Sequence, residues 1–286
     1  MELDNTRIGD FKHCPRYYYY RHVRHWAPED SGSPALWFGV FWGAAMDKLW
    51  VHKTVEAGME GFMEAWYAHG LTWPLPLAYQ KQWGHHTPET AKRMLKPYWE
   101  KRRAFIESVQ LLHVDKGLSY HEDGGDLDIT YVAKPDKVFR VDGEVCAVDH
   151  KSTGYGSAAG FSFSWVENWQ LSAQLDGYRW LLAKLYKQDM VNLWVDAALV
   201  NKTAVKFELL PIRKMEAWNE EWLKDTEYWT HRIVEAHCLM DFRKNDKSCR
   251  AFNRLCEYFD ICRWHPKPEE VELPQGFVER KWEPLA

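Results

Sequence analysis

Residues 127–151 read LDITYVAKPDKVFRVDGEVCAVDHK, and this stretch decides the fold that we predict. Two short apolar runs, at 138–141 and 145–148, flank the dipeptide Asp142-Gly143. A tight two-residue hairpin turn needs positive φ values, which Asp-Gly adopts readily. The stretch therefore predicts a β-hairpin.

Charged side chains stand at the ends of both predicted strands. Asp136 precedes the first strand, and Asp149 and Lys151 follow directly on the second. Because side chains alternate along a strand, Asp149 and Lys151 share one face and His150 points to the other. Carboxylates suit Mg²⁺ or Mn²⁺, and an adjacent ammonium can orient a water molecule or neutralise a phosphate. Surface charges at strand ends are the alternative, because a single Asp-x-Lys often occurs by chance.

Pro135-Asp136, twelve intervening residues and Asp149-His150-Lys151 resemble the signature of the PD-(D/E)xK nucleases. In that family the hairpin carries the two acids and the lysine. Gln174 and Tyr178 lie one turn apart on a helix that we predict for residues 167–187. They resemble the Q-x-x-x-Y motif of the RecB-like branch, where the pair flanks the active site and helps to place DNA. A surface Gln beside a core Tyr is the alternative.

A second helix, predicted to begin near Trp37, contains the sequence WGAAMDKL at residues 42–49. It resembles the F-G-x-A-x-H-x-x-L helix of the family, whose His is commonly a metal ligand. This chain has Asp47 at that position. Aspartate is an equally competent and harder ligand, so Asp47 is either a metal ligand or an acid on the helix surface.

The C-terminal region contains three cysteines in the stretch CRAFNRLCEYFDIC, residues 249–262. Zinc ribbons use close Cys pairs, so the C-x6-C-x5-C spacing is poor for zinc. Near the N-terminus, FKHCPRYYYY resembles the F-x-x-C-P-R-x-Y-x-Y element of RecB-like nucleases, including AddB-type, CRISPR-associated and phage or prophage members. The cysteine of that element is an iron–sulfur ligand in the family.

The resemblance implies a [4Fe-4S] cluster that joins the two ends of the chain. Its ligands would be Cys14, Cys249, Cys256 and Cys262. Buried free thiols are the alternative. We interpret Cys146 and Cys238 as core thiols, with Cys238 as the reserve ligand in place of Cys14.

Composition limits the remaining possibilities. The chain has 286 residues and a net charge of −4, which does not indicate a nucleic-acid binder overall. Basic clusters still occur, either as nucleic-acid contacts or as solvated helix faces: Lys12, Arg16, Arg21 and Arg24; Lys92, Arg93, Lys96, Lys101, Arg102 and Arg103; and Arg243, Lys244, Lys247, Arg250 and Arg254. The first residues are polar and no apolar stretch approaches about 20 residues, so we expect a cytoplasmic protein without a membrane partner.

We therefore predict an α/β fold, a central mixed sheet flanked by helices. The expected organisation is a single nuclease domain, 1–286, with its core at about 105–215 and helical parts at 1–104 and 214–265. We also predict a helix at 88–113, a loop or hairpin tip at 115–126, strands at 193–200 and 204–210, and a helix at 214–240.

The resemblance implies a metal-dependent DNA nuclease. Asp136 and Asp149 would hold Mg²⁺ or Mn²⁺ with Asp47 and the backbone carbonyl of His150, while Lys151 positions the attacking water or stabilises the transition state. We expect a single-strand exonuclease of recombination or repair, similar to phage enzymes, with a single-strand annealing or recombination protein as a possible partner. The alternatives are a non-catalytic DNA-binding iron–sulfur protein and a zinc-stabilised interaction protein. Cleavage polarity and oligomeric state do not follow from the sequence.

Overall fold

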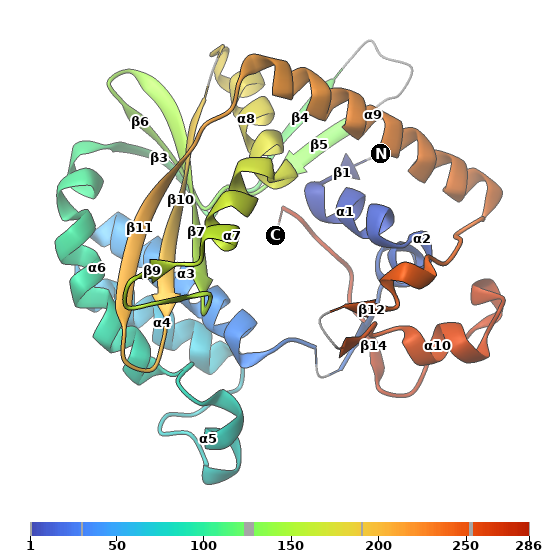
Figure 1. Ribbon diagram of the computed structural model, residues 1–286, viewed down its shortest axis with the longest axis horizontal. Helices are drawn as coiled ribbons and strands as arrows, with labels where there is room; N and C mark the ends of the chain where they lie inside the picture. Colours follow the sequence, from blue (N-terminus) through green and yellow to red (C-terminus); the bar gives the residue numbers. More distant parts are fainter. Residues whose placement is uncertain (1, 30, 123–128, 190, 252–253, 286) are drawn as a thin grey trace. The chain divides into compact units, whose positions relative to one another are not determined.

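The computed structural model describes residues 2–29, 31–122, 129–189, 191–251 and 254–285 (Figure 1). The chain forms two compact units. We call Gly32–Lys116 with Lys134–Glu216 the sheet unit, and Met1–Ser31 with Gly117–Ala133 and Ala217–Ala286 the terminal unit. The expected single nuclease domain stays a prediction.

The sheet unit is built on a five-stranded sheet in the order β11-β10-β7-β6-β3. Strands β7 and β10 are parallel, and the other neighbours are antiparallel, so the predicted mixed sheet is confirmed. Asp142 and Gly143 have φ values of 50° and 87°, as the hairpin turn requires. The strands are β3 (Gln110–Val114), β6 (Lys137–Val141), β7 (Glu144–Thr153), β10 (Asn192–Val200) and β11 (Val205–Ile212).

Helices flank this sheet (Figure 1). Helix α3 contacts β7, α6 contacts β11, and α8 contacts β7 and β10. The core beneath α3 and α6 is rich in buried aromatic side chains, among them Phe41, Trp42 and Trp50. The helices of this unit are α3 (Pro34–His52), α4 (Val55–Ala68), α5 (Leu77–Trp83), α6 (Pro88–Ser108), α7 (Phe163–Asn168), the 3₁₀ helix η2 (Trp169–Leu171) and α8 (Ala173–Tyr186).

Two of the predicted helix boundaries are wrong. Helix α6 ends at Ser108, and Gln110–Val114 forms the edge strand β3 instead of a last helical turn. The reason is pairing with β6, which outweighs local helix propensity. The helix predicted for 167–187 is likewise divided, because Ser172 is extended (φ −73°, ψ 113°) and separates η2 from α8.

The terminal unit contains a three-stranded sheet, β1-β5-β4, and several short elements. Strand β5 therefore pairs outside the central sheet. Strand β4, which pairs antiparallel with β5, occupies part of the segment predicted as a loop or hairpin tip at 115–126, of which 123–126 lie outside the described residues. The elements are β1 (Glu2–Leu3), α1 (Asn5–His13), α2 (Pro15–Tyr18), the π-helix η1 (Tyr19–Val23), β2 (Trp26–Pro28), β4 (Leu118–Glu122), β5 (Ile129–Ala133), α9 (Glu216–Leu239), η3 (Asp246–Ser248), β12 (Arg250–Ala251), β13 (Arg254–Leu255), α10 (Phe259–Trp264), η4 (Pro268–Glu270) and β14 (Phe277–Glu279).

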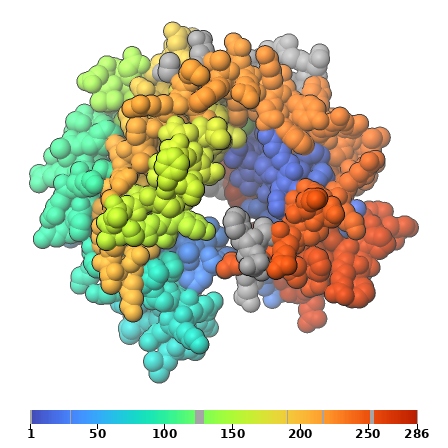
Figure 2. Space-filling model, in the orientation of Figure 1, coloured from blue at the N-terminus to red at the C-terminus, as the bar shows by residue number. Residues whose placement is uncertain are grey.

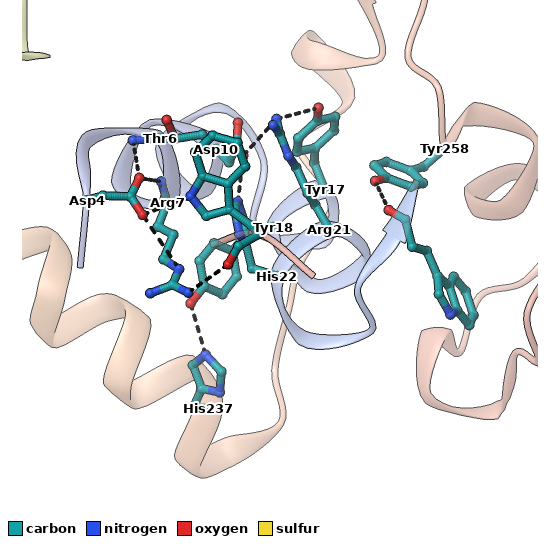
Figure 3. Close-up of polar contacts among 12 residues, drawn as sticks. Asp4, Thr6, Arg7, Asp10, Tyr17, Tyr18, Arg21, His22, His237 and Tyr258 are labelled. Carbon is teal, nitrogen blue, oxygen red and sulfur yellow. Dashed lines mark hydrogen bonds and ion pairs between the residues drawn. The ribbon is translucent and has the colours of Figure 1, made fainter. Parts of the chain in front are cut away.

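The basic residues near the N-terminus bond within the terminal unit (Figure 3). Arg21 lies 3.2 Å from the Asp10 carboxylate, which also accepts from His22 at 2.7 Å. Arg16 and Arg24 donate to the backbone carbonyls of residues 242 and 271, at 2.7 and 2.8 Å. These contacts stabilise the unit and engage much of the positive charge of this cluster.

No helix in the described part of the chain has the length and apolar character needed to cross a membrane.

Candidate active site

Asp136 and Asp149 meet where two strands separate. The ladder between β6 and β7 ends at the pair Lys137↔Val148, whereas β10 follows β7 as far as Thr153. Asp136 lies just before β6, and its Oδ2 accepts the backbone N–H of His150 at 2.5 Å, in place of a ladder hydrogen bond. Asp136, just before β6, is thus held beside Asp149 on β7. We call this place, where β6 and β7 separate, the fork.

Asp149 is almost completely buried, with 2% of its surface exposed. Burial raises the pKa of its carboxyl group, Lys151 opposes this rise, and the negative charge of Asp136 adds to it. Its Oδ2 lies 2.6 Å from Lys151 Nζ but has no well-directed hydrogen bond. A buried carboxylate oxygen that lacks a well-directed hydrogen bond is suited to binding a cation.

Lys151 lies on the same face of β7 as Asp149, as alternation predicts. Burial acts to lower the pKa of Lys151, but the carboxylates of Asp149 and Asp136 outweigh it and raise the pKa above its ordinary value. The Trp169 ring lies 5.4 Å from Nζ and adds a cation–π contact. Lys151 is therefore a permanent cation at neutral pH.

The donor set at the fork fits a divalent ion. Magnesium is typically bound by one or two carboxylates and retains several waters, so the buried Asp149 and the partly buried Asp136 are sufficient. Among the described residues, no group of three or more His, Cys, Asp or Glu side chains is placed to hold an ion. Asp136 and Asp149 would be the protein ligands, and the His150 carbonyl stays a predicted third.

Asp47 is engaged by a residue that sequence reasoning missed. Its Oδ1 lies 2.5 Å from Nζ of Lys137, whose side chain is completely buried. Burial raises the pKa of Asp47, Lys137 counteracts this, and Asp136 contributes a further rise, so the two acids are within electrostatic range. The predicted ligand role of Asp47 is untested. The signal available in the sequence was Lys137 itself, directly after the Pro-Asp pair.

Gln174 and Tyr178 lie against the loop that carries Asp136. Gln174 Nε2 donates to the Tyr178 hydroxyl at 2.8 Å, and that hydroxyl donates to the backbone carbonyl of Lys134 at 3.1 Å. The same loop is also held by Asp115, whose backbone N–H donates to the carbonyl of Asp136 at 2.8 Å. The pair therefore helps to fix the Pro135-Asp136 loop.

A buried polar network on the opposite face of β7 was not foreseen. Asp196 of β10 accepts from Tyr98 at 2.7 Å and from two nitrogens of Arg102 at 2.8 and 3.1 Å. His150 Nδ1 lies 3.5 Å from the same carboxylate. The network holds the side chain of His150, the residue between Asp149 and Lys151 in the sequence. Its sequence signal was a single acid in the apolar run LWVDAALV.

The structure brings together four cysteines from both ends of the chain. The Asn245 N–H donates to Cys14 Sγ at 3.2 Å, and the Cys256 N–H to the Cys249 carbonyl at 3.0 Å. Burial raises the pKa of Cys256 to about 11, with Cys262 and Cys14 adding to the rise. Burial also raises the pKa of Cys262, and Cys14 and Cys249 contribute.

These four thiols influence one another, but the described residues do not arrange three of them as a metal site. The present arrangement therefore does not fit an iron–sulfur cluster, and the predicted [4Fe-4S] centre is not supported. Cys146 is buried, as predicted for a core thiol, whereas Cys238 is exposed, so its assignment to the core was wrong.

Comparison with known proteins bears on the fold. A crystal structure from Eubacterium rectale, described as a "putative exonuclease", shares 15% sequence identity and a TM-score of 0.57 and covers 91% of this chain and 92% of that chain. The crystal structure of SSO0001 gives 12% identity, covers 53% of this chain and 69% of that chain, and at a TM-score of 0.26 does not bear on the fold. Among curated proteins, no sequence matches.

The family comparison bears on the chain as a whole. The model of the PD-(D/E)XK nuclease superfamily matches residues 5–263. This range includes the hairpin, the fork and the Gln174–Tyr178 pair, and the predicted kinship and fold class are confirmed. The chain belongs to the PD-(D/E)XK nuclease superfamily.

Proposed function

We propose that the protein is a metal-dependent deoxyribonuclease whose active site is the fork between β6 and β7. The observation that carries this proposal is the buried Asp149 beside the partly buried Asp136, with Asp149 Oδ2 lacking a well-directed donor. Two carboxylates this close repel each other unless a cation or a proton intervenes. Lys151 supplies one positive charge, and a divalent ion would supply the rest.

The reaction is hydrolysis of a phosphodiester. Water attacks phosphorus, a P–O bond to one sugar oxygen breaks, and that oxygen leaves as an alcohol. A divalent ion at Asp136 and Asp149 would act as a Lewis acid on the phosphate and lower the pKa of water. Lys151, whose pKa the carboxylates of Asp149 and Asp136 raise, would stabilise negative charge on the phosphoryl oxygens.

A single-strand preference is supported by exposed apolar side chains that follow Lys151. Tyr155, Phe163 and Leu171 are 66%, 80% and 80% exposed. These side chains come from the segment 155–171, which includes β8 (Gly156–Ser157), β9 (Gly160–Phe161), α7 and η2. Figure 2 shows this segment in yellow-green at the molecular surface. Unpaired bases can stack on exposed aromatic rings, whereas stacked and paired bases cannot. This surface therefore favours a strand with free bases, as a single-strand exonuclease of recombination or repair would bind.

The test is cleavage of end-labelled single- and double-stranded DNA by the purified protein in Mg²⁺, in Mn²⁺ and in a chelator. We expect metal-dependent loss of the single strand, and no cleavage by Asp149→Asn. A folded protein that binds DNA without cleaving it under any metal would favour the alternative, a non-catalytic DNA-binding protein. Cleavage that persists in the chelator would contradict the proposed chemistry.

A separate measurement tests Cys14, Cys249, Cys256 and Cys262. Iron and zinc per chain are measured after anaerobic purification. A [4Fe-4S] centre would give about four irons per chain by its composition, lost in Cys14→Ala and retained in Cys146→Ala. Absence of iron from protein purified anaerobically would rule out the cluster. Stoichiometric zinc would favour the alternative, a zinc-stabilised interaction protein.

A further inference from the structure

A cavity of about 410 Å³ lies where β10 begins and β11 ends, outside the fork. Arg179, Arg213 and Lys214 contribute to its lining, together with Asn192. Lys214 is compensated, since its Nζ lies 3.0 Å from Asp176 Oδ2. Arg213 is exposed, whereas Arg179 has 3% of its surface exposed. The lining therefore has an excess of positive charge.

Arg179 is bonded in an unusual way for a buried cation. Its Nε and Nη2 donate to the backbone carbonyls of Val191 and Lys214, at 3.4 and 3.1 Å. The third nitrogen, Nη1, is buried, and the described residues place no acceptor on it. A buried donor without an acceptor costs free energy, and an anionic oxygen would satisfy both the donor and the charge.

The rim of the cavity is linked to the neighbourhood of Lys151 through Gln170. Arg213 N–H donates to Gln170 Oε1 at 3.1 Å, and Gln170 Nε2 donates to the Pro211 carbonyl at 3.1 Å. Gln170 follows Trp169, whose ring contacts Lys151. These contacts connect the rim of the cavity to the candidate active site.

The strand register shows how far the cavity lies from the candidate active site along β10. Val195 pairs with Asp149, and Leu193, in the lining, lies two residues earlier on β10. Two strand residues span about 7 Å.

We propose that this cavity, which we call the Arg179 pocket, binds a phosphate group of the nucleic-acid strand, other than the one that is cleaved. The inference rests on the proposed nuclease function and adds to it a second anchor for the strand. Arg179 Nη1 supplies a fixed donor at the base of the pocket, and Arg213 supplies mobile positive charge at its rim. The occupant is either an internal phosphodiester or a terminal phosphate of that strand.

The test uses Arg213→Ala, because Arg213 is exposed and only its backbone makes a hydrogen bond that the structure describes. Binding of a labelled single-stranded oligonucleotide is measured by fluorescence anisotropy over a range of salt concentrations, in a chelator to prevent cleavage. Loss of one phosphate contact should lower the slope of log K against log salt by about 0.7. Lys81→Ala, at an exposed position on α5, is the matched control and should leave the slope unchanged.

Arg179→Gln is the second variant and should lower the slope in the same way, provided that its unfolding curve shows a folded protein. A scan of single methylphosphonate substitutions locates the contact. Wild type should lose affinity at one position, and Arg213→Ala should be insensitive there. An effect confined to end-phosphorylated oligonucleotides would assign the pocket to a terminal phosphate, and an effect at an internal position to a phosphodiester; both support the proposal.

Salt slopes of Arg213→Ala and folded Arg179→Gln equal to those of wild type would overturn it. That result differs from a failure of the proposed function, in which wild type neither binds nor cleaves the oligonucleotide.

Discussion

Replacement of Arg102 by methionine should destabilise the protein strongly, although Arg102 lies outside the fork. The side chains of Arg102 and Asp196 are 7% and 1% exposed, and two guanidinium nitrogens donate to one carboxylate oxygen. Removing one partner of a buried ion pair leaves an uncompensated charge and costs about 3–5 kcal/mol. For a protein of this size each kcal/mol shifts Tm by roughly 2–4 °C, so we expect Tm to fall by about 6–20 °C.

The Arg102–Asp196 pair also determines the direction in which stability changes with pH. Burial acts to raise the pKa of Asp196, but His150 and Arg102 outweigh it and lower the pKa below its ordinary value. The ionised carboxylate therefore stabilises the native state above the unfolded pKa of about 3.9, and this contribution is lost as pH falls through the lower folded pKa. In Arg102→Met the carboxyl group can be protonated in the folded state, so the deficit relative to wild type should shrink on acidification toward pH 4.

Urea unfolding at pH 7 and at pH 4.5 measures both effects. Arg103→Met is the matched control, because Arg103 is an exposed neighbour whose pair with Glu107 should contribute no more than about 1 kcal/mol. The double variant Arg102→Met/Asp196→Asn should recover much of the loss, since the buried charge is then absent. If Arg102→Met costs no more than Arg103→Met, the network does not stabilise the fold as argued.

Three further predictions concern the fork. Lys151→Met should lower the cleavage rate by at least about 10²-fold while the protein stays folded, because it removes one electrostatic stabiliser; cleavage at the wild-type rate would reject the assignment. Asp47→Ala should raise the metal concentration needed for half-maximal cleavage if Asp47 is a ligand, and Asp47→His should partly restore activity and favour Mn²⁺; an unchanged metal titration would leave Asp47 as the partner of Lys137 alone. Tyr178→Phe removes the hydrogen bond to the Lys134 carbonyl and should weaken metal binding, measured by calorimetry, more than it weakens stability; unchanged metal affinity would show that the bond does not position Asp136.

The hairpin and the residues at its ends could be predicted because the relevant interactions are local. The Asp142-Gly143 turn sets the register of β6 and β7, and the register in turn brings Asp136 beside Asp149. Period-two alternation then places Lys151 on the same face as Asp149. The Gln174–Tyr178 pair followed from the helical spacing, which also predicted that the two side chains meet.

The partners supplied by distant elements could not be predicted in this way. Lys137 meets Asp47 only because α3 packs on the face of β6 toward which Lys137 points, and Asp196 meets Arg102 only because α6 packs over the same side of the sheet. Alternation shows which face a residue occupies, but not which helix covers that face. Edge strand β3 was missed for a related reason, since its conformation depends on pairing with β6 and not on its own sequence.

On strand β7 the candidate catalytic residues alternate with a residue of the stabilising network. Asp149 and Lys151 point toward the face where the substrate would bind, whereas His150 points toward Asp196, Arg102 and Tyr98. Burial acts to raise the pKa of both acids. Asp149 keeps a raised pKa, whereas at Asp196 the contacts with His150 and Arg102 outweigh burial and lower the pKa. A buried carboxylate with a raised pKa destabilises the native state at neutral pH, whereas the lowered pKa of Asp196 on the other face of the strand is that of a stabilising contact. Substitutions behind the strand should therefore alter stability first, and substitutions in front of it should alter catalysis first.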